Sequence, residues 1–157
     1  GPLAREPVTG IKIKLLDVSL HEDPVHRGPG QIIPAFRNTI RAAILRADPT
    51  FLEPKQIVRV DAPEELIGAI SRELENRRGQ IMDITNERGP TVVKARIPVA
   101  EIFGMDASLK SATSGRGFYS VIEVVFEPIP KNLRDEAIIK VRKRKGLPEG
   151  LPTANVD

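Results

Sequence analysis

Hydrophobic and polar positions alternate near the start of the chain. Alternation of this kind predicts a β-strand over residues 11–20, and a shift of phase by one residue in its middle is typical of a bulge. The apolar positions are Ile11, Ile13, Leu15, Leu16, Val18 and Leu20. Because one strand is not stable alone, we expect it to pair with a neighbouring copy or to lie against the C-terminal helix.

The apolar spacing becomes helical over residues 31–47. Pro34 fits the first turn of such a helix, and Asp48-Pro49 ends it. The apolar stripe consists of Ile33, Phe36, Ile40, Ala43, Ile44 and Ala47. Between the predicted strand and helix, residues 21–31 form a loop at the tip of the pair, a place where chains often present functional residues.

Residues 53–128 read as six successive elements. The pattern predicts a strand at 56–60, a helix from Pro63 that closes at Gly79, strands at 80–85 and 91–97 around a turn at 86–90, a helical segment at 99–114 broken near Gly104, and a strand at 118–126. In the last strand, valines at 121, 124 and 125 indicate burial on both faces. The order βαββαβ predicts an α+β, ferredoxin-like sandwich, an antiparallel sheet with both helices on one side.

A further helix is expected over residues 132–145, followed by Gly146 and a loosely ordered tail from 147 to 157. We therefore divide the chain into residues 1–52, 53–128 and 129–157. The last turns of this helix are strongly basic, and five cations in six residues repel one another unless anions screen them. They are Lys140, Arg142, Lys143, Arg144 and Lys145.

Composition narrows the function classes. The net charge of +3 and the pI near 9.4 are compatible with a nucleic-acid partner. The absence of cysteine excludes disulfides and a thiolate nucleophile, and it fits a cytoplasmic setting. No apolar run approaches the roughly 20 residues that span a bilayer, so we expect no membrane partner. No phosphate-binding loop of the Walker type is present, so no nucleotide cofactor is expected in this chain.

The two histidines of the chain, His21 and His26, lie in the loop at 21–31. Their spacing matches no usual zinc pattern, and we expect no metal site. A general-base role lacks a visible nucleophile or pocket. A solvated surface histidine is the alternative. The Arg27-Gly28-Pro29-Gly30 turn favours contact with phosphate or bases, because it presents an imidazole beside a cation at a helix start.

The pattern Asp-Val-x-Leu-His-x-Asp-x-x-His-Arg-Gly-x-x-Gln, read from Asp17 to Gln31, resembles the elongation factor 2 family of ribosomal translocation GTPases. The resemblance implies that His26 is converted to diphthamide by dedicated synthesis enzymes, and that ADP-ribosylating toxins act there. Pro29, where eukaryotic members usually have glycine, points to an archaeal-type sequence. The tip residues implied to contact the decoding centre are His21, Asp23, His26, Arg27, Gly28, Gly30 and Gln31, with bracing of the turn as the alternative for His21 and Asp23.

The same resemblance implies an organisation for the whole chain. Residues 1–52 would be the end of domain IV, a strand–loop–helix piece of a ribosomal-protein-S5-like domain, residues 53–128 would be domain V, and the terminal helix would pack back on domain IV. The implied function is a C-terminal arm that contacts the ribosome and its tRNA–mRNA duplex during GTP-dependent translocation. GTP and Mg would bind elsewhere in the full-length factor, and the fragment itself would not be an enzyme. Candidate contacts with ribosomal RNA are Arg37, Arg41 and the basic cluster of the terminal helix, and Arg46 shares the outward ridge of Arg37 and Arg41.

Two rival functions remain open from the sequence. A stand-alone RNA-binding module on the ferredoxin-like frame would display stacking aromatics, for which Phe118 and Tyr119 are the main candidates. An acylphosphatase-like hydrolase would need a phosphate cradle after the first strand of the sandwich. The acidic segment Asp61-Ala-Pro-Glu-Glu65 does not suit that purpose.

Overall fold

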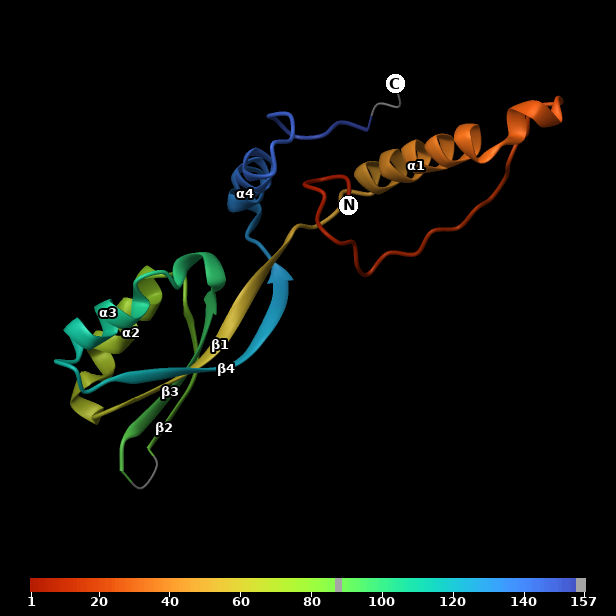
Figure 1. Cartoon of the computed structure of the whole chain (residues 1–157). Helices are drawn as coiled ribbons and strands as arrows, with labels where there is room; N and C mark the ends of the chain where they lie inside the picture. The colour runs from red at the N-terminus through yellow and green to blue at the C-terminus, as the bar shows by residue number, and fades with distance from the viewer. Residues whose placement is uncertain (87–88, 155–157) are drawn as a thin grey trace. The chain divides into compact units, whose positions relative to one another are not determined.

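The structure, a computed structural model, describes residues 1–86 and 89–154 and contains two compact units (Figure 1). Unit 2 is Leu52–Pro128. Unit 1 combines residues 1–51 with the described residues from 129 onward. No helix in the described ranges has the length and apolar character needed to cross a bilayer.

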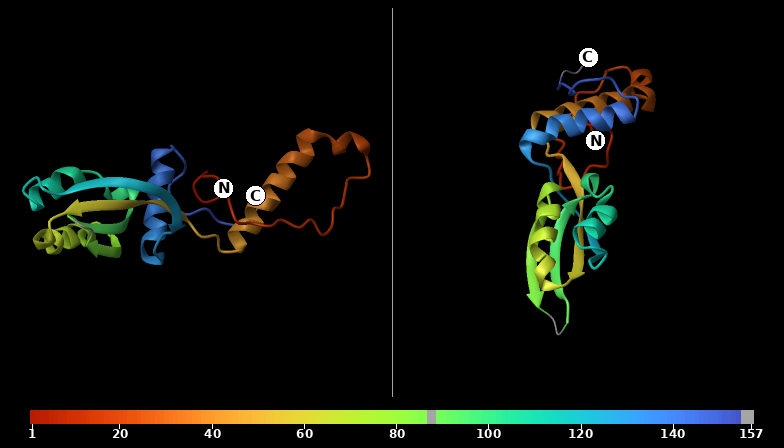
Figure 2. Two further views of the ribbon diagram at one scale, coloured as in Figure 1. Left: turned by 90° about the horizontal axis from the view of Figure 1, so that it is seen from below. Right: turned by 90° about the vertical axis from the view of Figure 1, so that its left-hand side faces the viewer.

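Unit 2 is built on a four-stranded sheet. Its strands are β1 (Leu52–Ala62), β2 (Gln80–Asn86), β3 (Thr91–Pro98) and β4 (Phe118–Pro128). They lie in the order β2-β3-β1-β4, and all neighbours are antiparallel. Helix α2 (Ile67–Asn76), which follows the short turn η2 (Glu64–Leu66), and helix α3 (Met105–Ala112), which follows η3 (Val99–Glu101), cover one face (Figure 2). The predicted ferredoxin-like βαββαβ fold is confirmed.

The register of the central strands explains the core. Val58 is paired with Ala95, and Val60 with Val93. Because alternate residues of a strand point to the same face, these pairs line the face that the helices cover. Ile70 and Leu74 from α2 and Leu109 from α3 pack onto them. The complete buried cluster is Val58, Val60, Ala62, Ile70, Leu74, Val93, Ala95, Ile97, Met105 and Leu109.

Two glycines mark helix boundaries in unit 2: Gly79 follows the end of α2, and Gly104 precedes the start of α3. The amide of Gly79 donates to the carbonyl of Leu74 at 2.8 Å after α2 ends, as the sequence predicts. Gly104 has a φ of 75° at the N-cap of α3. This left-handed residue divides the expected helical segment at 99–114 into η3 and α3, so the predicted break is confirmed.

Strand β4 is an edge strand, and the expected burial of both its faces is wrong. Val121 and Val124 are 47% and 51% exposed. A run of apolar residues cannot distinguish a central strand from an edge strand, because only the topology decides how many neighbours a strand has. In the hairpin between β2 and β3, the Thr91 hydroxyl donates to the Asn86 side chain at 2.9 Å. The turn predicted at 86–90 includes residues 87 and 88, which lie outside the described residues.

Unit 1 contains helices α1 (Pro29–Arg46) and α4 (Lys131–Arg144). Helix α1 begins two residues earlier than the sequence predicts, so Pro34 lies inside the helix rather than in its first turn. The predicted strand at 11–20 is not formed. These residues are exposed along their whole length and belong to no ladder. Alternation predicts an extended conformation, but a strand needs a partner, and the only sheet among the described residues lies in unit 2.

The predicted apolar stripe of α1 is largely uncovered. No residue of this stripe is buried, and Ile33 and Phe36 are 54% and 37% exposed. The one buried residue of α1 is Ala42, which lies outside the predicted stripe. The periodicity therefore predicts the helix correctly but not the burial of its stripe, since burial depends on which elements lie against it.

Helix α4 holds residues 3–6 through cations of its last turns. The guanidinium of Arg142, which is 9% exposed, donates to the carbonyls of Leu3 at 2.9 Å and Pro148 at 3.1 Å. The ammonium of Lys145 donates to the carbonyls of Ala4 and Arg5, each at 3.1 Å, and pairs with Glu6 at 2.6 Å. The terminal helix therefore contacts residues 3–6 and not the exposed segment 11–20, which corrects the expected position of that segment.

Candidate functional site

The loop that contains both histidines folds into one turn of 3-10 helix, η1 (Pro24–Arg27), immediately before α1. Asp23 caps this turn, because its carboxylate accepts from the amide of Val25 at 2.9 Å. The carbonyl of Asp23 accepts from the amide of His26 at 3.1 Å. Asp23 therefore stabilises the turn through both its side chain and its backbone.

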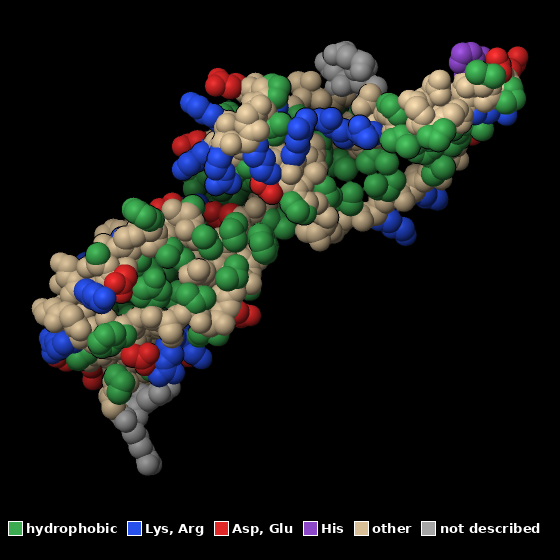
Figure 3. Space-filling view, viewed as in Figure 1, with side chains coloured by type: hydrophobic (Ala, Val, Ile, Leu, Met, Phe, Trp, Pro, Cys, Tyr) green, Lys and Arg blue, Asp and Glu red, His purple; other side chains and the backbone are tan. Residues whose placement is uncertain are grey.

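His21 lies against this turn. Its Nδ1 accepts a hydrogen bond from the amide of Asp23 at 3.1 Å, so its hydrogen must be on Nε2. The rings of His21 and His26 are 4.7 Å apart between centroids and meet edge to face at 65°. Both are exposed, and Figure 3 shows the two purple side chains together at the surface beside acidic groups. These hydrogen bonds are the ones that the bracing alternative for His21 and Asp23 requires, and their contact with the decoding centre stays a prediction.

Arg27 turns back onto the start of the loop. Its Nε donates to the carbonyl of His21 at 2.5 Å, and its Nη2 donates to the carbonyl of Glu22 at 2.8 Å. These two nitrogens form one edge of the guanidinium. The side chain remains exposed, but this edge is bonded to the protein's own backbone.

The two glycines of the loop, Gly28 and Gly30, do not have the positive φ angles that favour glycine. Gly28 has φ −71° and ψ 159°, which any residue can adopt, and serves as the N-cap of α1. Its carbonyl accepts from the amides of Gln31 and Ile32 at 3.0 and 3.1 Å. Gly30 lies in the first turn of α1, and a Cβ there would meet open space. Neither glycine is required by the fold of the described chain.

The basic residues of unit 1 divide into two groups. One group is engaged within the chain: Arg142 and Lys145 hold residues 3–6, and their expected contact with ribosomal RNA stays a prediction. The other group is exposed, with no ion pair to another described residue. Among the candidate contacts and their neighbours, it includes Arg37, Arg41, Arg46, Lys140, Lys143 and Arg144.

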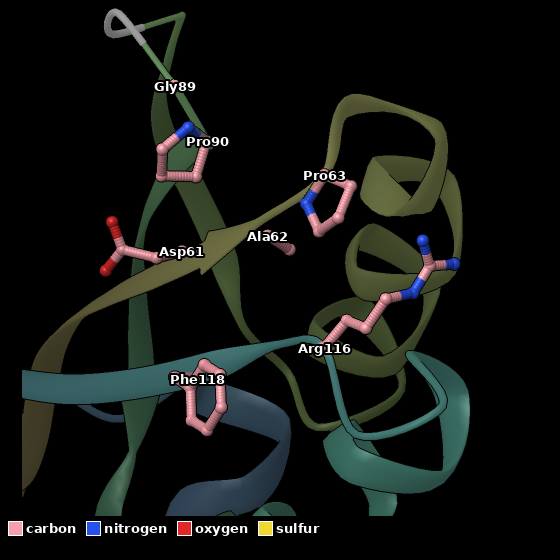
Figure 4. Close-up of a pocket in the computed structure, with 7 residues that line it drawn as sticks. All are labelled: Asp61, Ala62, Pro63, Gly89, Pro90, Arg116 and Phe118. Atoms are coloured by element: carbon pink, nitrogen blue, oxygen red, sulfur yellow. The ribbon is translucent and has the colours of Figure 1, made fainter.

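No cluster of three or more metal-ligating side chains occurs among residues 1–86 and 89–154. A shallow, largely apolar depression of about 460 Å³ lies in unit 2 where β1 ends and β4 begins (Figure 4). Phe118 is 63% exposed at its border, whereas Tyr119 packs on the core. Of the two aromatics that the rival RNA-binding function needs, one is therefore unavailable.

Sequence reasoning missed Phe103. Its side chain is 96% exposed, and the preceding turn η3 is held by the guanidinium of Arg77. The only local signal was the glycine that follows it, which marks the start of α3. A periodicity argument assigns such a residue to a helix face and cannot show that the turn presents it to solvent.

Residues 1–48 match the family model "Elongation factor G, domain IV", and residues 50–137 match "Elongation factor G C-terminus". The chain belongs to this elongation factor G family, in its domain IV and C-terminal regions. The resemblance drawn from the loop is thereby confirmed.

Curated relatives sharpen this assignment. The chain is 48% identical over 98% of its length to elongation factor 2 of Methanococcoides burtonii and 48% identical over 97% to elongation factor 2 of Archaeoglobus fulgidus. It is 45% identical over 94% to elongation factor 2 of Nanoarchaeum equitans. The chain spans only about a fifth of the length of these relatives, 20–21%.

Proposed function

We propose that this chain is the ribosome-contacting arm of a translocation factor, and that His26 is its contact and modification point. In the full-length factor, GTP hydrolysis elsewhere would move the arm, and the loop at 21–31 would enter the decoding centre and hold the tRNA–mRNA duplex. His26 would carry diphthamide and make contacts rather than break bonds. Diphthamide-synthesis enzymes and ADP-ribosylating toxins would act on the same imidazole.

The observation that carries this proposal is the presentation of His26. Its ring is exposed on a loop held by Asp23 and Arg27, in a chain that belongs to a translocation-factor family. A histidine with only a structural role is expected to pack among neighbours. The two glycines nearby support the same reading, because glycine without a conformational reason often marks a place where another molecule approaches the backbone.

Charge supports unit 1 as the RNA-contacting part. Unit 1 has 14 Lys and Arg against 9 Asp and Glu over the sequence assigned to it, whereas unit 2 has 10 against 12. Most cations of unit 2 are also paired, for example Arg96 with Glu127 at 2.9 Å and Arg78 with Glu53 at 2.6 Å. Phosphate binding depends on unpaired cations, so the exposed Arg37, Arg41, Lys140, Lys143 and Arg144 are the proposed contacts with ribosomal RNA.

The stand-alone RNA-binding module is the second candidate. Phe118 on the sheet of unit 2 is the observation in its favour, because exposed aromatics stack on bases. A Phe118→Ala variant tests it against the main proposal. A large loss of RNA binding in that variant, with His26→Ala unaffected, would favour the module.

The proposal is tested by substituting His26 with Ala or Gln in the full-length factor that contains this chain. We expect slower single-turnover translocation, with GTP hydrolysis unchanged. Mass measurement of the peptide spanning His26, from cells with diphthamide-synthesis enzymes, should show a modified histidine. An unmodified mass would remove the diphthamide role, and an unchanged translocation rate in both variants would remove the contact role.

A further inference from the structure

The loop at 21–27 is closed by its own side chains, and we infer that Arg27 is a positioning residue that fixes how His26 is presented, acting through His21. This inference rests on the proposed role of His26. It assigns Arg27 a task other than the phosphate contact that its charge alone suggests.

The first step of the argument is the edge of the guanidinium that Arg27 uses. Nε and Nη2 donate to two successive carbonyls, those of His21 and Glu22, at 2.5 and 2.8 Å. Such a pair of parallel donors is also the arrangement with which arginine grips a phosphate. Because this edge is bonded within the loop, it is not available to bind RNA in the same way while the loop keeps this fold.

The second step is the path from Arg27 to the imidazole of His26. Arg27 holds the backbone of His21, and the ring of His21 lies 4.7 Å from the ring of His26. The ring of His21 is itself fixed, because its Nδ1 accepts from the amide of Asp23. A guanidinium, a carbonyl and an imidazole therefore connect residue 27 to the ring of His26.

The third step is that little else restrains this end of the loop. All residues from 21 to 27 are exposed, and η1 contains no buried residue. Without hydrophobic packing, the order of the turn depends on its hydrogen bonds, each worth about 1 kcal/mol net and more when one partner is charged. Removal of the Arg27 bridge should therefore loosen the turn without unfolding either unit.

Substitution of Arg27 by lysine or by glutamine distinguishes loss of its hydrogen bonds to the carbonyls of His21 and Glu22 from a general loss of structure. Lysine can hold two successive carbonyls in this protein, as Lys145 does with Ala4 and Arg5. Arg27→Lys should therefore restore much of the bridge, whereas Arg27→Gln should lose it. At position 21, His21→Asn keeps a side-chain acceptor for the amide of Asp23 but removes the ring that contacts His26. His21→Ala removes both. Arg72→Gln is a matched control, since Arg72 is an exposed arginine of unit 2.

The experiment measures two quantities on the full chain. Amide exchange with water at Val25 and His26, measured by NMR without RNA, reports the order of the turn. The modified fraction of His26 after co-expression with diphthamide-synthesis enzymes, measured by mass spectrometry, reports its presentation. Exchange at Val58 and Val60, in the core of unit 2, serves as a check on folding in the same spectra.

We expect exchange at His26 to rise about tenfold in Arg27→Gln, the factor to which ~1.4 kcal/mol corresponds, together with a lower modified fraction. Arg27→Lys should recover most of both, and Arg72→Gln should match the parent chain. His21→Asn should keep the exchange rates close to those of the parent but still lower the modified fraction, which a purely structural role of His21 would not do.

Two results would overturn the inference: unchanged exchange at His26 in Arg27→Gln, or, where the parent chain is modified, faster exchange with an unchanged modified fraction. If the parent chain is never modified but Arg27→Gln still loosens the turn, the diphthamide role fails. The bracing by Arg27 then stands alone, so the two failures are distinguishable.

Discussion

The guanidinium of Arg77 donates a hydrogen bond of 2.8 Å to the backbone carbonyl of Phe103, whose own side chain is 96% exposed. The same guanidinium donates to the carbonyl of Glu101 at 2.7 Å and to the hydroxyl of Ser108 at 3.0 Å, and it pairs with Glu73 at 2.6 Å. One side chain at the end of α2 thus fixes the turn η3 and the start of α3.

We predict that Arg77→Met lowers the free energy of unfolding of unit 2 by about 2–4 kcal/mol. The methionine keeps most of the apolar contact, but four acceptors lose a charged donor, and such bonds are worth roughly 1.5–3 kcal/mol each before relaxation. Urea unfolding followed by circular dichroism measures the change. Arg72→Met, on the exposed side of the same helix, should stay within about 0.5 kcal/mol. Equal stabilities of the two variants would contradict the bracing role of Arg77.

Gly79 and Gly104 allow two backbone constraints to be compared: a steric clash of an added Cβ at residue 79 and a positive φ angle at residue 104. A Cβ at residue 79 would lie 2.5 Å from the carbonyl oxygen of Leu74, so Gly79→Ala requires a backbone shift. At residue 104 a Cβ would meet open space, but φ is 75°, so Gly104→Ala costs only about 1 kcal/mol of conformational strain. We predict that Gly79→Ala is the more destabilising by thermal unfolding. The reverse order would show that the backbone around Leu74 adapts without cost.

Gly30→Ala should separate stability from function. Residue 30 lies in α1 with open space around its Cα, so alanine should stabilise the helix by up to about 1 kcal/mol. If the glycine is there to let a partner approach the backbone, the same variant should bind ribosomes more weakly despite its greater stability. Thermal unfolding and ribosome pelleting measure the two effects. Unchanged ribosome binding would show that Gly30 gives no support for a contact at the start of α1.

The pKa of Glu65 offers a test of a surface ion pair. A hydrogen bond with the backbone of Glu65 and then one from the guanidinium of Arg116, at 2.9 Å, lower the pKa of this carboxyl. A lowered folded pKa means that the pair stabilises the fold above the ordinary carboxyl pKa, and that this contribution is lost as pH falls through the lowered value. Arg116→Gln should raise the pKa of Glu65, as followed by NMR titration. An unchanged value would show that the backbone alone sets it.

The salt dependence of RNA binding tests whether the exposed cations of unit 1, rather than those of unit 2, provide the attraction for RNA. Substitution of Lys140, Lys143 and Arg144 together by Gln should weaken binding to ribosomal RNA and flatten its dependence on salt, because fewer counterions are released. The matched triple in unit 2 is Arg72, Lys94 and Lys110, and its substitution should have a smaller effect. Filter binding at several salt concentrations measures both. Equal losses would show that unit 2 contributes as much electrostatic attraction as unit 1.

The sequence by itself determined the type of each element in unit 2. The signals of strand, helix and helix end are local in sequence, and local conformational preferences are enough to fulfil them. The strands are signalled at 56–60 and 91–97, the helix by the apolar spacing of Leu66, Ile67, Ile70 and Leu74, and the helix boundaries by the glycines at 79 and 104. The loop motif from Asp17 to Gln31 was equally informative about family, because its residue types and spacing are specific.

Tertiary structure alone decided which of these elements are covered and which side chains are already engaged. Residues 11–20 alternate as a strand does, yet they form none, because a ladder needs a partner that no local pattern supplies. Val121 and Val124 are exposed since β4 has a neighbour on one side only. Arg27 and Arg142 have the same charge as any other arginine in the sequence. Only the fold brings backbone carbonyls to them, so that both guanidinium groups are hydrogen-bonded within the protein.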